Sequence, residues 1–201
     1  MNNKNNLLFL ILLLGVFLRI FYLEHQPIWF DEASSILIVG KNPFLAWQNQ
    51  TLFPNPPLYF TLLHYWMRHF GNSLFAVRFL SALGGIFSIS LLFVLGKRFF
   101  SKEVGLSAAL LMAISPFHIY YSQEVRCYSF LVFLVLLSSY FFLLATDKDK
   151  TIYWIGYVIS TTAAFYMHNY AIFPFLAHFV YFLFFPKFRP KKLLWSIGAI
   201  L

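Results

Sequence analysis

The stretch LYFTLLHYWMRHF, residues 58–70, decides how the chain is arranged, because it is apolar enough to enter a membrane and yet short. A helix of this length covers about 20 Å at 1.5 Å per residue, which is less than the ~30 Å of a hydrocarbon core. Its polar side chains Thr61, His64 and Arg68 recur on one helical face. We therefore expect an amphipathic helix over 58–70 that begins after the prolines of 55–57 and lies in the membrane interface.

The basic residues of the later loops support this arrangement. If 58–70 crossed the membrane, these residues would face outward, although basic residues normally gather on the cytoplasmic side. If 58–70 lies flat in the first outer loop, they face the cytoplasm together with Lys4 and the N-terminus. They are Lys97, Arg98, Lys102, Lys148, Lys150, Lys187, Arg189, Lys191 and Lys192.

The composition of the chain is that of a polytopic membrane protein. Of 201 residues, 60% are hydrophobic, 22% are aromatic and only 11% are charged. We predict an all-α transmembrane helix bundle in which residues 1–201 form a single membrane domain with about six spanning helices. The apolar runs lie at 7–23, 74–96, 104–121, 127–145, 152–167 and 170–185. The run 193–201 covers only about 13 Å, so the chain is expected to be the N-terminal part of a longer protein or a truncated copy.

Charge and cysteine content exclude several classes of function. The net charge of +8 arises from basic residues in short loops between apolar runs, so their expected partners are anionic lipid headgroups and not nucleic acid. The single cysteine, Cys127, excludes an intrachain disulfide and a cysteine-rich metal site. No small-x-small cleavage site follows the first apolar run, which predicts an uncleaved helix in a multi-pass protein of the plasma or inner membrane.

Two adjacent carboxylates, Asp31 and Glu32, follow the first apolar run in the stretch PIWFDEASS, residues 27–35. In the predicted topology they share the outer face with the polar sets 123–126 and 168–170. Because neighbouring helical residues point about 100° apart, one acid would act as a general base while the other orients it. In the alternative interpretation, Asp31 is an N-cap that accepts the N–H of Ser34, and Glu32 is an exposed acid of the first helical turn.

Other polar residues of the outer face are candidates for binding. Glu124 would face Asp31 and hold a divalent metal cation, or it would simply pair with Arg126. Four cationic candidates for a phosphate site are Arg78, Arg126, His64 and His168. The alternative for His168 is a buried polar network. Aromatic residues at these helix ends are most simply an interfacial belt.

Five motifs, in this order, resemble the GT-C superfamily of membrane glycosyltransferases, specifically the bacterial family 39 enzymes related to protein O-mannosyltransferases and to the lipid A aminoarabinose transferase. They are Trp29-Phe30-Asp31-Glu32-Ala33, Asn55-Pro56-Pro57-Leu58-Tyr59, Phe70-Gly71-Asn72-Ser73 followed by Arg78, Ser115-Pro116, and Ser122-Gln123-Glu124-Val125-Arg126-Cys127-Tyr128-Ser129. The resemblance implies transfer of a sugar, with inversion, from a polyprenyl-phosphate donor to an acceptor lipid, glycan or protein outside the membrane. It makes Asp31 the general base, Glu32 its partner, and Glu124 the counterpart of a second acidic or metal-contacting residue, which is often Asp in relatives.

Two other functions fit part of the pattern. A lipid-linked sugar flippase or transporter would need polar groups within the spans, where Arg19 is the only formal charge well inside an apolar run. An inactive truncated paralogue, or an assembly subunit, would agree with the short final run.

Overall fold

The computed structural model describes residues 3–41, 56–184 and 200, and within these ranges it is all-α with no strand. The predicted fold class, an all-α membrane helix bundle, is confirmed. The helices are α1 (Asn3–Ile20), α2 (Phe30–Lys41), α4 (Leu58–Phe70), α5 (Leu74–Phe99), α6 (Lys102–Ile114), α7 (Pro116–Ser122), α8 (Tyr128–Lys148), α9 (Thr151–Met167) and α10 (Ile172–Phe184), with the short 3-10 helix η1 (Asn169–Ala171) before α10. The predicted final run, 193–201, falls almost wholly outside the described residues.

Two of the described helices, α5 and α8, are long and apolar enough to cross a membrane. A third span is formed if α6 and α7 are one helix, bent by 62° at a break. Because α1 and α10 are shorter apolar helices, the prediction of about six spans stays a prediction.

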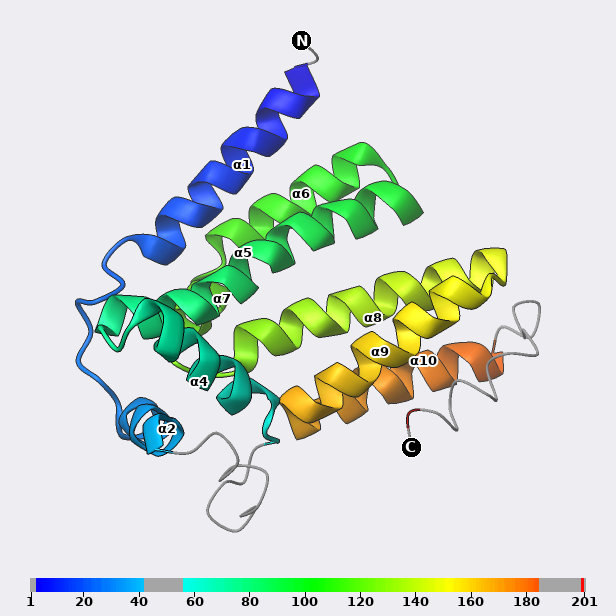
Figure 1. Cartoon of the computed structure of the whole chain (residues 1–201). Helices are drawn as coiled ribbons and strands as arrows, with labels where there is room; N and C mark the ends of the chain where they lie inside the picture. Colours follow the sequence, from blue (N-terminus) through cyan, green and yellow to red (C-terminus); the bar gives the residue numbers. More distant parts are fainter. Residues whose placement is uncertain (1–2, 42–55, 185–199, 201) are drawn as a thin grey trace.

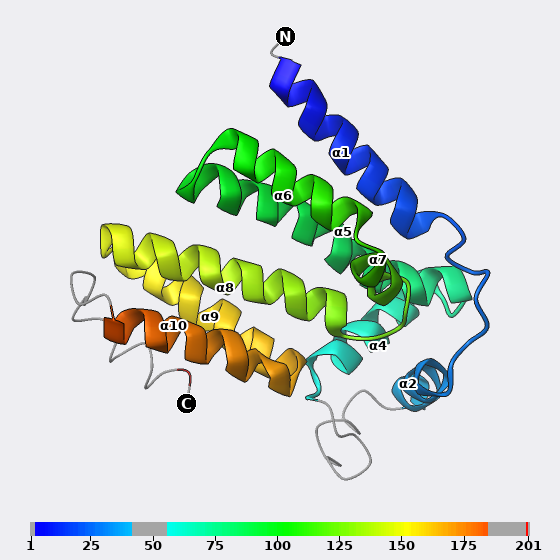
Figure 2. The same cartoon turned by 180° about the vertical axis from the view of Figure 1, so that it is seen from behind.

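Two antiparallel hairpins, α5 with α6 and α8 with α9, form the centre of the bundle, and α5 packs against α8 (Figures 1 and 2). The close approach of α5 and α8 depends on Gly84, where an added Cβ would lie 3.0 Å from the backbone nitrogen of Phe130. Close packing, as expected of small residues in membrane helices, therefore explains this glycine.

The break between α6 and α7 follows from Pro116, which has no N–H to donate to the carbonyl of Met112 four residues earlier. Arg19 of α1 replaces that donor. Its guanidinium donates to the carbonyls of Met112 and Ala113 at 3.0 and 3.1 Å, and to Nδ1 of His118 at 2.8 Å. A fully buried arginine in an apolar helix is thus accommodated by the carbonyls at the end of α6.

A second set of hydrogen bonds links the segment after α7 to α1, with the donor now on the α7 side. Gln123, which follows α7, donates its amide to carbonyls at the end of α1, at 3.2 Å from Leu18 and 3.0 Å from Phe21. As a result, Arg19 of α1 satisfies carbonyls at the end of α6, and Gln123 after α7 satisfies carbonyls at the end of α1. The α6–α7 break and the residue after α7 are thus both tied to α1.

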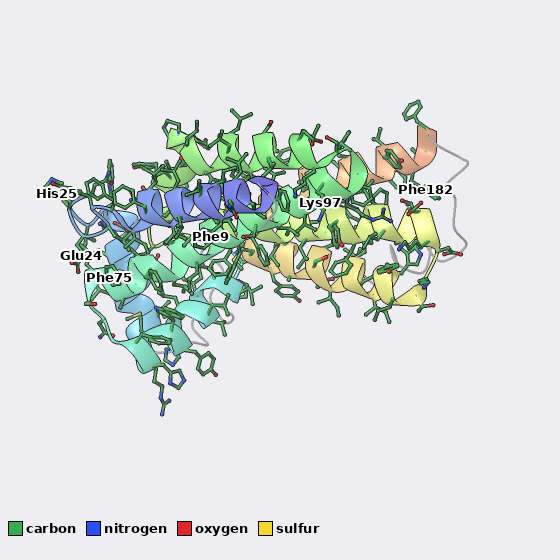
Figure 3. The ribbon with its side chains drawn as sticks, turned by 90° about the horizontal axis from the view of Figure 1, so that it is seen from above. Phe9, Glu24, His25, Phe75, Lys97 and Phe182 are labelled. Atoms are coloured by element: carbon green, nitrogen blue, oxygen red, sulfur yellow. The ribbon has the colours of Figure 1, made fainter. Side chains whose placement is uncertain are left out.

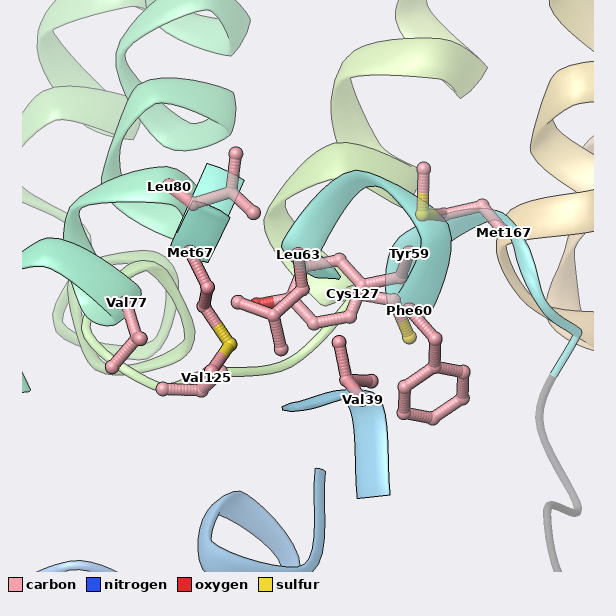
Figure 4. Close-up of a cluster of buried hydrophobic side chains, with 10 residues drawn as sticks. All are labelled: Val39, Tyr59, Phe60, Leu63, Met67, Val77, Leu80, Val125, Cys127 and Met167. Atoms are coloured by element: carbon pink, nitrogen blue, oxygen red, sulfur yellow. The ribbon is translucent and has the colours of Figure 1, made fainter. Parts of the chain in front are cut away.

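Helix α4 has the predicted bounds and runs at a steep angle to α5 and α8 (Figure 1). It buries Tyr59, Phe60, Leu63 and Met67 inside the protein and leaves apolar side chains such as Tyr65 exposed. Figure 4 shows the core that α4 shares with its neighbours, and its ten residues are Val39, Tyr59, Phe60, Leu63, Met67, Val77, Leu80, Val125, Cys127 and Met167. Helix α2 contributes Val39 to this core, and the α7–α8 connection contributes Val125 and Cys127. The interfacial position of α4 remains a prediction.

The two ends of α5 differ in character. At its start, the carboxylate of Glu24 accepts the backbone N–H of Phe75 at 3.1 Å, which ties the α1–α2 connection to α5. Figure 3 shows Glu24, His25 and Phe75 together at one end of the molecule and Lys97 far along α5 from them. The basic residues of the α5–α6 turn therefore lie away from the end that carries α2.

Candidate active site

The carboxylates of Asp31 and Glu32 diverge at the start of α2. Helix α2 begins at Phe30, so Asp31 lies inside the first turn and not at the N-cap considered as an alternative. The carboxylate that reaches back is that of Glu32, which accepts the backbone N–H of Trp29 at 3.2 Å. The Asp31 side chain is 65% exposed, whereas that of Glu32 is 1% exposed. The two acids thus point in different directions, as predicted, so that the carboxylate of Asp31 is exposed and that of Glu32 is buried.

Glu32 accepts two hydrogen bonds at each oxygen. Arg78 donates from Nη2 at 2.7 Å and from Nε at 3.0 Å, a bidentate geometry, while the backbone N–H of Val125 donates at 2.9 Å. Burial alone would raise the pKa of Glu32, but the hydrogen bonds from Arg78, Val125 and Trp29 outweigh it and lower that pKa. Glu32 therefore stays ionised with its lone pairs occupied, which suits an orienting role better than proton transfer.

Arg78 is fully engaged as well. Besides its bonds to Glu32, it donates to the backbone carbonyls of Leu23 at 2.9 Å, Gln26 at 3.0 Å and Pro27 at 3.3 Å. All five guanidinium N–H groups have acceptors in this arrangement. Arg78 thus holds the α1–α2 connection against α5, and no donor remains for a phosphate unless one of these bonds opens.

Because Glu32 binds the N–H of Val125, it also fixes the loop that joins α7 to α8. This loop carries Glu124 and Arg126 on either side of Val125. The buried pair of Glu32 and Arg78 therefore brings together two of the three polar sets predicted to converge.

A pocket of about 340 Å³ opens where these segments meet. Its polar members are Asp31, Glu32, Glu124 and Arg126, and its walls are aromatic. The aromatic lining consists of Trp29, Phe30, Tyr120, Tyr121 and Tyr128. A pocket with one arginine, two accessible acids and several aromatic faces is suited to a ligand that has an anionic group and a hydroxylated ring.

Arg126 is the cation of this pocket. Its Nη1 lies 3.6 Å from Oδ2 of Asp31, and its guanidinium lies over the ring of Tyr128 at 5.6 Å from the centroid. Burial works to lower the pKa of Arg126, but the hydrogen bond to the Tyr128 oxygen and the charge of Asp31 raise it. Arg126 therefore stays charged and keeps donors toward the pocket.

Glu124 is half-buried, lies one residue before Val125, and accepts a hydrogen bond from the hydroxyl of Tyr120. Burial, together with the negative charge of Glu32, raises the pKa of Glu124 in spite of that hydrogen bond and the nearby arginines. Besides the occupied carboxylate of Glu32, the pocket thus contains the carboxylates of Asp31 and Glu124, of which Asp31 is the more exposed.

The two histidine candidates differ in position. His168 lies beside the pocket, with its ring 5.7 Å from that of Tyr128, and its Nδ1 accepts the N–H of Tyr170 at 3.1 Å. Burial, and then the charge of Arg126, lower the pKa of His168, which favours the neutral ring. His64 lies on α4, where its Nδ1 donates to the carbonyl of Val39 at 2.8 Å, and it does not line the pocket.

The residues present do not fit a tightly held metal ion. Among the described residues, no three His, Cys, Asp or Glu side chains gather in a way that would bind one. The oxygens of Glu32 are occupied by donors, which leaves Asp31 and Glu124, and Arg126 contributes a positive charge to the same pocket. Since Ca²⁺ and Mg²⁺ take about six or more oxygen ligands, no chemical step is assigned to a metal.

Sequence reasoning missed the aromatic walls. Aromatic residues at these helix ends were predicted to form an interfacial belt and not a sugar platform, whereas in the structure Tyr120, Tyr121 and Tyr128, which lie in or just before the motif 122–129, line the pocket. The pairing of Glu32 with Arg78 had no local signal, because the two residues are 46 positions apart.

Comparison with known proteins identifies the family. A sequence model described as dolichyl-phosphate-mannose-protein mannosyltransferase matches residues 54–201. The chain belongs to this family. The description of the dolichyl-phosphate-mannose-protein mannosyltransferase family is that of membrane glycosyltransferases that use a lipid-linked donor, which agrees with the general prediction made from the sequence. The narrower relation to family 39 or to the aminoarabinose transferase stays a prediction.

A relative of this mannosyltransferase-family chain is an uncharacterized protein of Aquifex aeolicus (strain VF5). The two are 26% identical over 168 residues, which make up 77% of this chain and 33% of the relative. The chain thus spans about a third of the length of that protein. No solved structure matches the chain.

Proposed function

We propose that the chain provides the donor pocket and the general base of a glycosyltransferase that moves a sugar from a polyprenyl-phosphate carrier to an acceptor hydroxyl at the outer face of the membrane. The observation that carries the proposal is the pocket in which the open carboxylate of Asp31, the guanidinium of Arg126 and aromatic walls lie together. Membership of the mannosyltransferase family supports the lipid-linked donor in general.

Asp31 is the general base of the proposed reaction. It takes the proton of the acceptor hydroxyl while the hydroxyl oxygen attacks the anomeric carbon of the donor sugar. The bond between that carbon and the phosphate oxygen breaks in the same step, so the configuration at the carbon is inverted. Asp31 suits this role because its side chain is 65% exposed and projects from a helical turn that Glu32 holds in place.

Arg126 receives the phosphate. The leaving polyprenyl phosphate carries negative charge away from the sugar, and a fixed guanidinium stabilises that charge as it develops. A phosphate needs no strong acid behind it as a leaving group. His168 lies next to the same region, and its neutral ring donates a hydrogen bond more readily than it supplies charge.

Glu124 and the tyrosines bind the sugar. The carboxylate of Glu124, already bonded to the hydroxyl of Tyr120, accepts hydrogen bonds from sugar hydroxyls. The rings of Tyr121 and Tyr128, whose centroids are 4.9 Å apart in an edge-on arrangement, provide apolar faces for the ring of the sugar.

The proposed orientation puts this pocket outside the cell. The α5–α6 and α8–α9 turns, which carry Lys97, Arg98, Lys102, Lys148 and Lys150, lie away from α2 (Figure 1). Basic residues at that end favour its placement on the cytoplasmic side. The lipid tail of the donor would then lie among the apolar helices of the bundle.

The test is transfer of a labelled sugar from a polyprenyl-phosphate carrier by membranes that contain the full-length protein. Asp31→Asn should abolish transfer and leave expression and insertion unchanged. A matched control is Asp147→Asn, since Asp147 is an exposed aspartate that pairs with Arg98 at 3.3 Å and has no place in the pocket. Transfer retained by Asp31→Asn would refute the assignment of the base.

A further inference from the structure

The pocket contains an ion pair between the two groups that the proposed reaction must separate. Asp31 as a base needs a free oxygen, and Arg126 as a phosphate ligand needs free donors, yet Oδ2 of Asp31 and Nη1 of Arg126 lie 3.6 Å apart. We propose that the donor phosphate displaces Asp31 from Arg126, so that Asp31 opposes donor binding in the free enzyme and is released as a base when the donor binds. This inference rests on the proposed function.

The Asp31 pair is weak by comparison with the other arginine–carboxylate pair of the site. Glu32 and Arg78 are 1% and 2% exposed and meet at 2.7 Å, with further donors on both glutamate oxygens. Asp31 and Arg126 are 65% and 17% exposed, and 3.6 Å is longer than a good hydrogen bond. Exposed pairs of this kind contribute little to stability, because water screens them. The Glu32–Arg78 pair therefore stays closed, and the Asp31–Arg126 pair opens at little cost in free energy.

The surroundings of Arg126 allow the exchange without movement of the backbone. Its guanidinium is held from the side of Tyr128, through the ring at 5.6 Å and the hydroxyl at 3.4 Å, so it keeps its place when the anion changes. On the other side, the backbone of α2 is fixed by the bond from Trp29 to Glu32. Only the side chain of Asp31 has to rotate.

The exchange also links binding to reactivity. A phosphate on Arg126 occupies the guanidinium donors that face Asp31. Oδ2 of Asp31 is then free to accept a hydrogen bond, and afterwards the proton, from the acceptor hydroxyl. A sugar without a phosphate would leave the ion pair intact, so the pair also discriminates in favour of phosphate-linked donors.

The test measures binding and not transfer, which separates it from the test of the proposed function. The full-length protein in nanodiscs of zwitterionic lipid is titrated with a long-chain polyprenyl monophosphate and, separately, with inorganic phosphate. Asp31→Asn should bind the polyprenyl monophosphate about two- to fivefold more tightly than the wild type, because up to about 1 kcal/mol of competing ion pair is lost. Arg126→Gln should weaken binding at least tenfold, and Asp147→Asn should leave it unchanged.

The double variant isolates the exchange from the general effect of removing a negative charge. In the Arg126→Gln background, Asp31→Asn should give no gain in affinity, because the competing pair no longer exists. An equal gain in both backgrounds, or weaker binding by Asp31→Asn alone, would overturn the exchange. The same gain with inorganic phosphate would support exchange through the phosphate group without the tail. If the wild type binds no polyprenyl monophosphate, the proposed function fails and this inference fails with it.

Discussion

Replacing Glu32 by glutamine is the sharpest perturbation of the site, because it removes one charge from a buried pair and changes the shape of the side chain very little. Arg78 would then remain 2% exposed with no carboxylate against it. Removal of one partner from a buried ion pair typically costs about 3–5 kcal/mol. Since 1.4 kcal/mol corresponds to a factor of ten, opening of the region should become about 10²- to 4 × 10³-fold more frequent.

Cys127 reports on this opening. It is the only cysteine of the chain, it is 5% exposed, and it lies two residues after Val125, whose N–H is bound by Glu32. Maleimide labelling of Cys127 through open states of the folded protein should therefore be slow in the wild type and faster by about the same 10²- to 4 × 10³-fold in Glu32→Gln. The thermal unfolding temperature should fall in parallel.

Glu24→Gln is the matched control, since Glu24 is an exposed carboxylate of the neighbouring connection. Its effect on stability should stay within about 0.5 kcal/mol. If Glu32→Gln labels at the wild-type rate and unfolds at the wild-type temperature, the buried pair does not hold the α7–α8 loop, and the reasoning about the geometry of the site is wrong.

Further predictions concern acid stability, the helix break and the sugar site. The pKa of Glu32 is lowered in the folded protein from its ordinary value of 4.5. The ionised Glu32 side chain therefore stabilises the fold fully above pH 4.5, and this stabilisation is lost as the pH falls through the lower pKa of the folded state. The stability of Glu32→Gln should depend less on pH in that acid range. Arg19→Met should lower the free energy of unfolding by about 1–3 kcal/mol, because buried carbonyls at the end of α6 lose their donor. Adding Pro116→Ala to this variant should restore part of that free energy, because alanine supplies a backbone N–H. If the double variant shows no recovery, the proposed cause of the helix break is wrong. Glu124→Gln should raise KM for the donor more than it lowers kcat in a transfer assay, and an unchanged KM would remove Glu124 from the sugar site.

The parts of the structure that depend on local patterns were predictable from the sequence. Helix α4 begins and ends where the prolines of 55–57 and Gly71 predict, because both residue types restrict the backbone whatever surrounds them. The divergence of Asp31 and Glu32 follows from helical geometry alone. The all-α class follows from long apolar runs, since a backbone in lipid must satisfy its own hydrogen bonds.

The parts that depend on contacts between distant segments were not predictable. Arg78 appeared to be a phosphate ligand because it is a cation near the expected outer face, but its donors are taken by Glu32 and by carbonyls of the α1–α2 connection. Arg19 appeared only as a charge within an apolar run, and its role became visible only when α1 was placed against the break at Pro116. In both cases the partner lies tens of residues away, and no sequence periodicity reports it.

The bonds of Glu32 have a consequence for how the protein is made. Its partners are Arg78 and the N–H of Val125, which lie 46 and 93 positions later in the chain. During synthesis, the carboxylate of Glu32 therefore has neither of these partners until the ribosome has passed residues 78 and 125. The proposed site can form only after residue 125 has been made, so a nascent chain halted before that residue would contain the proposed base but no pocket around it.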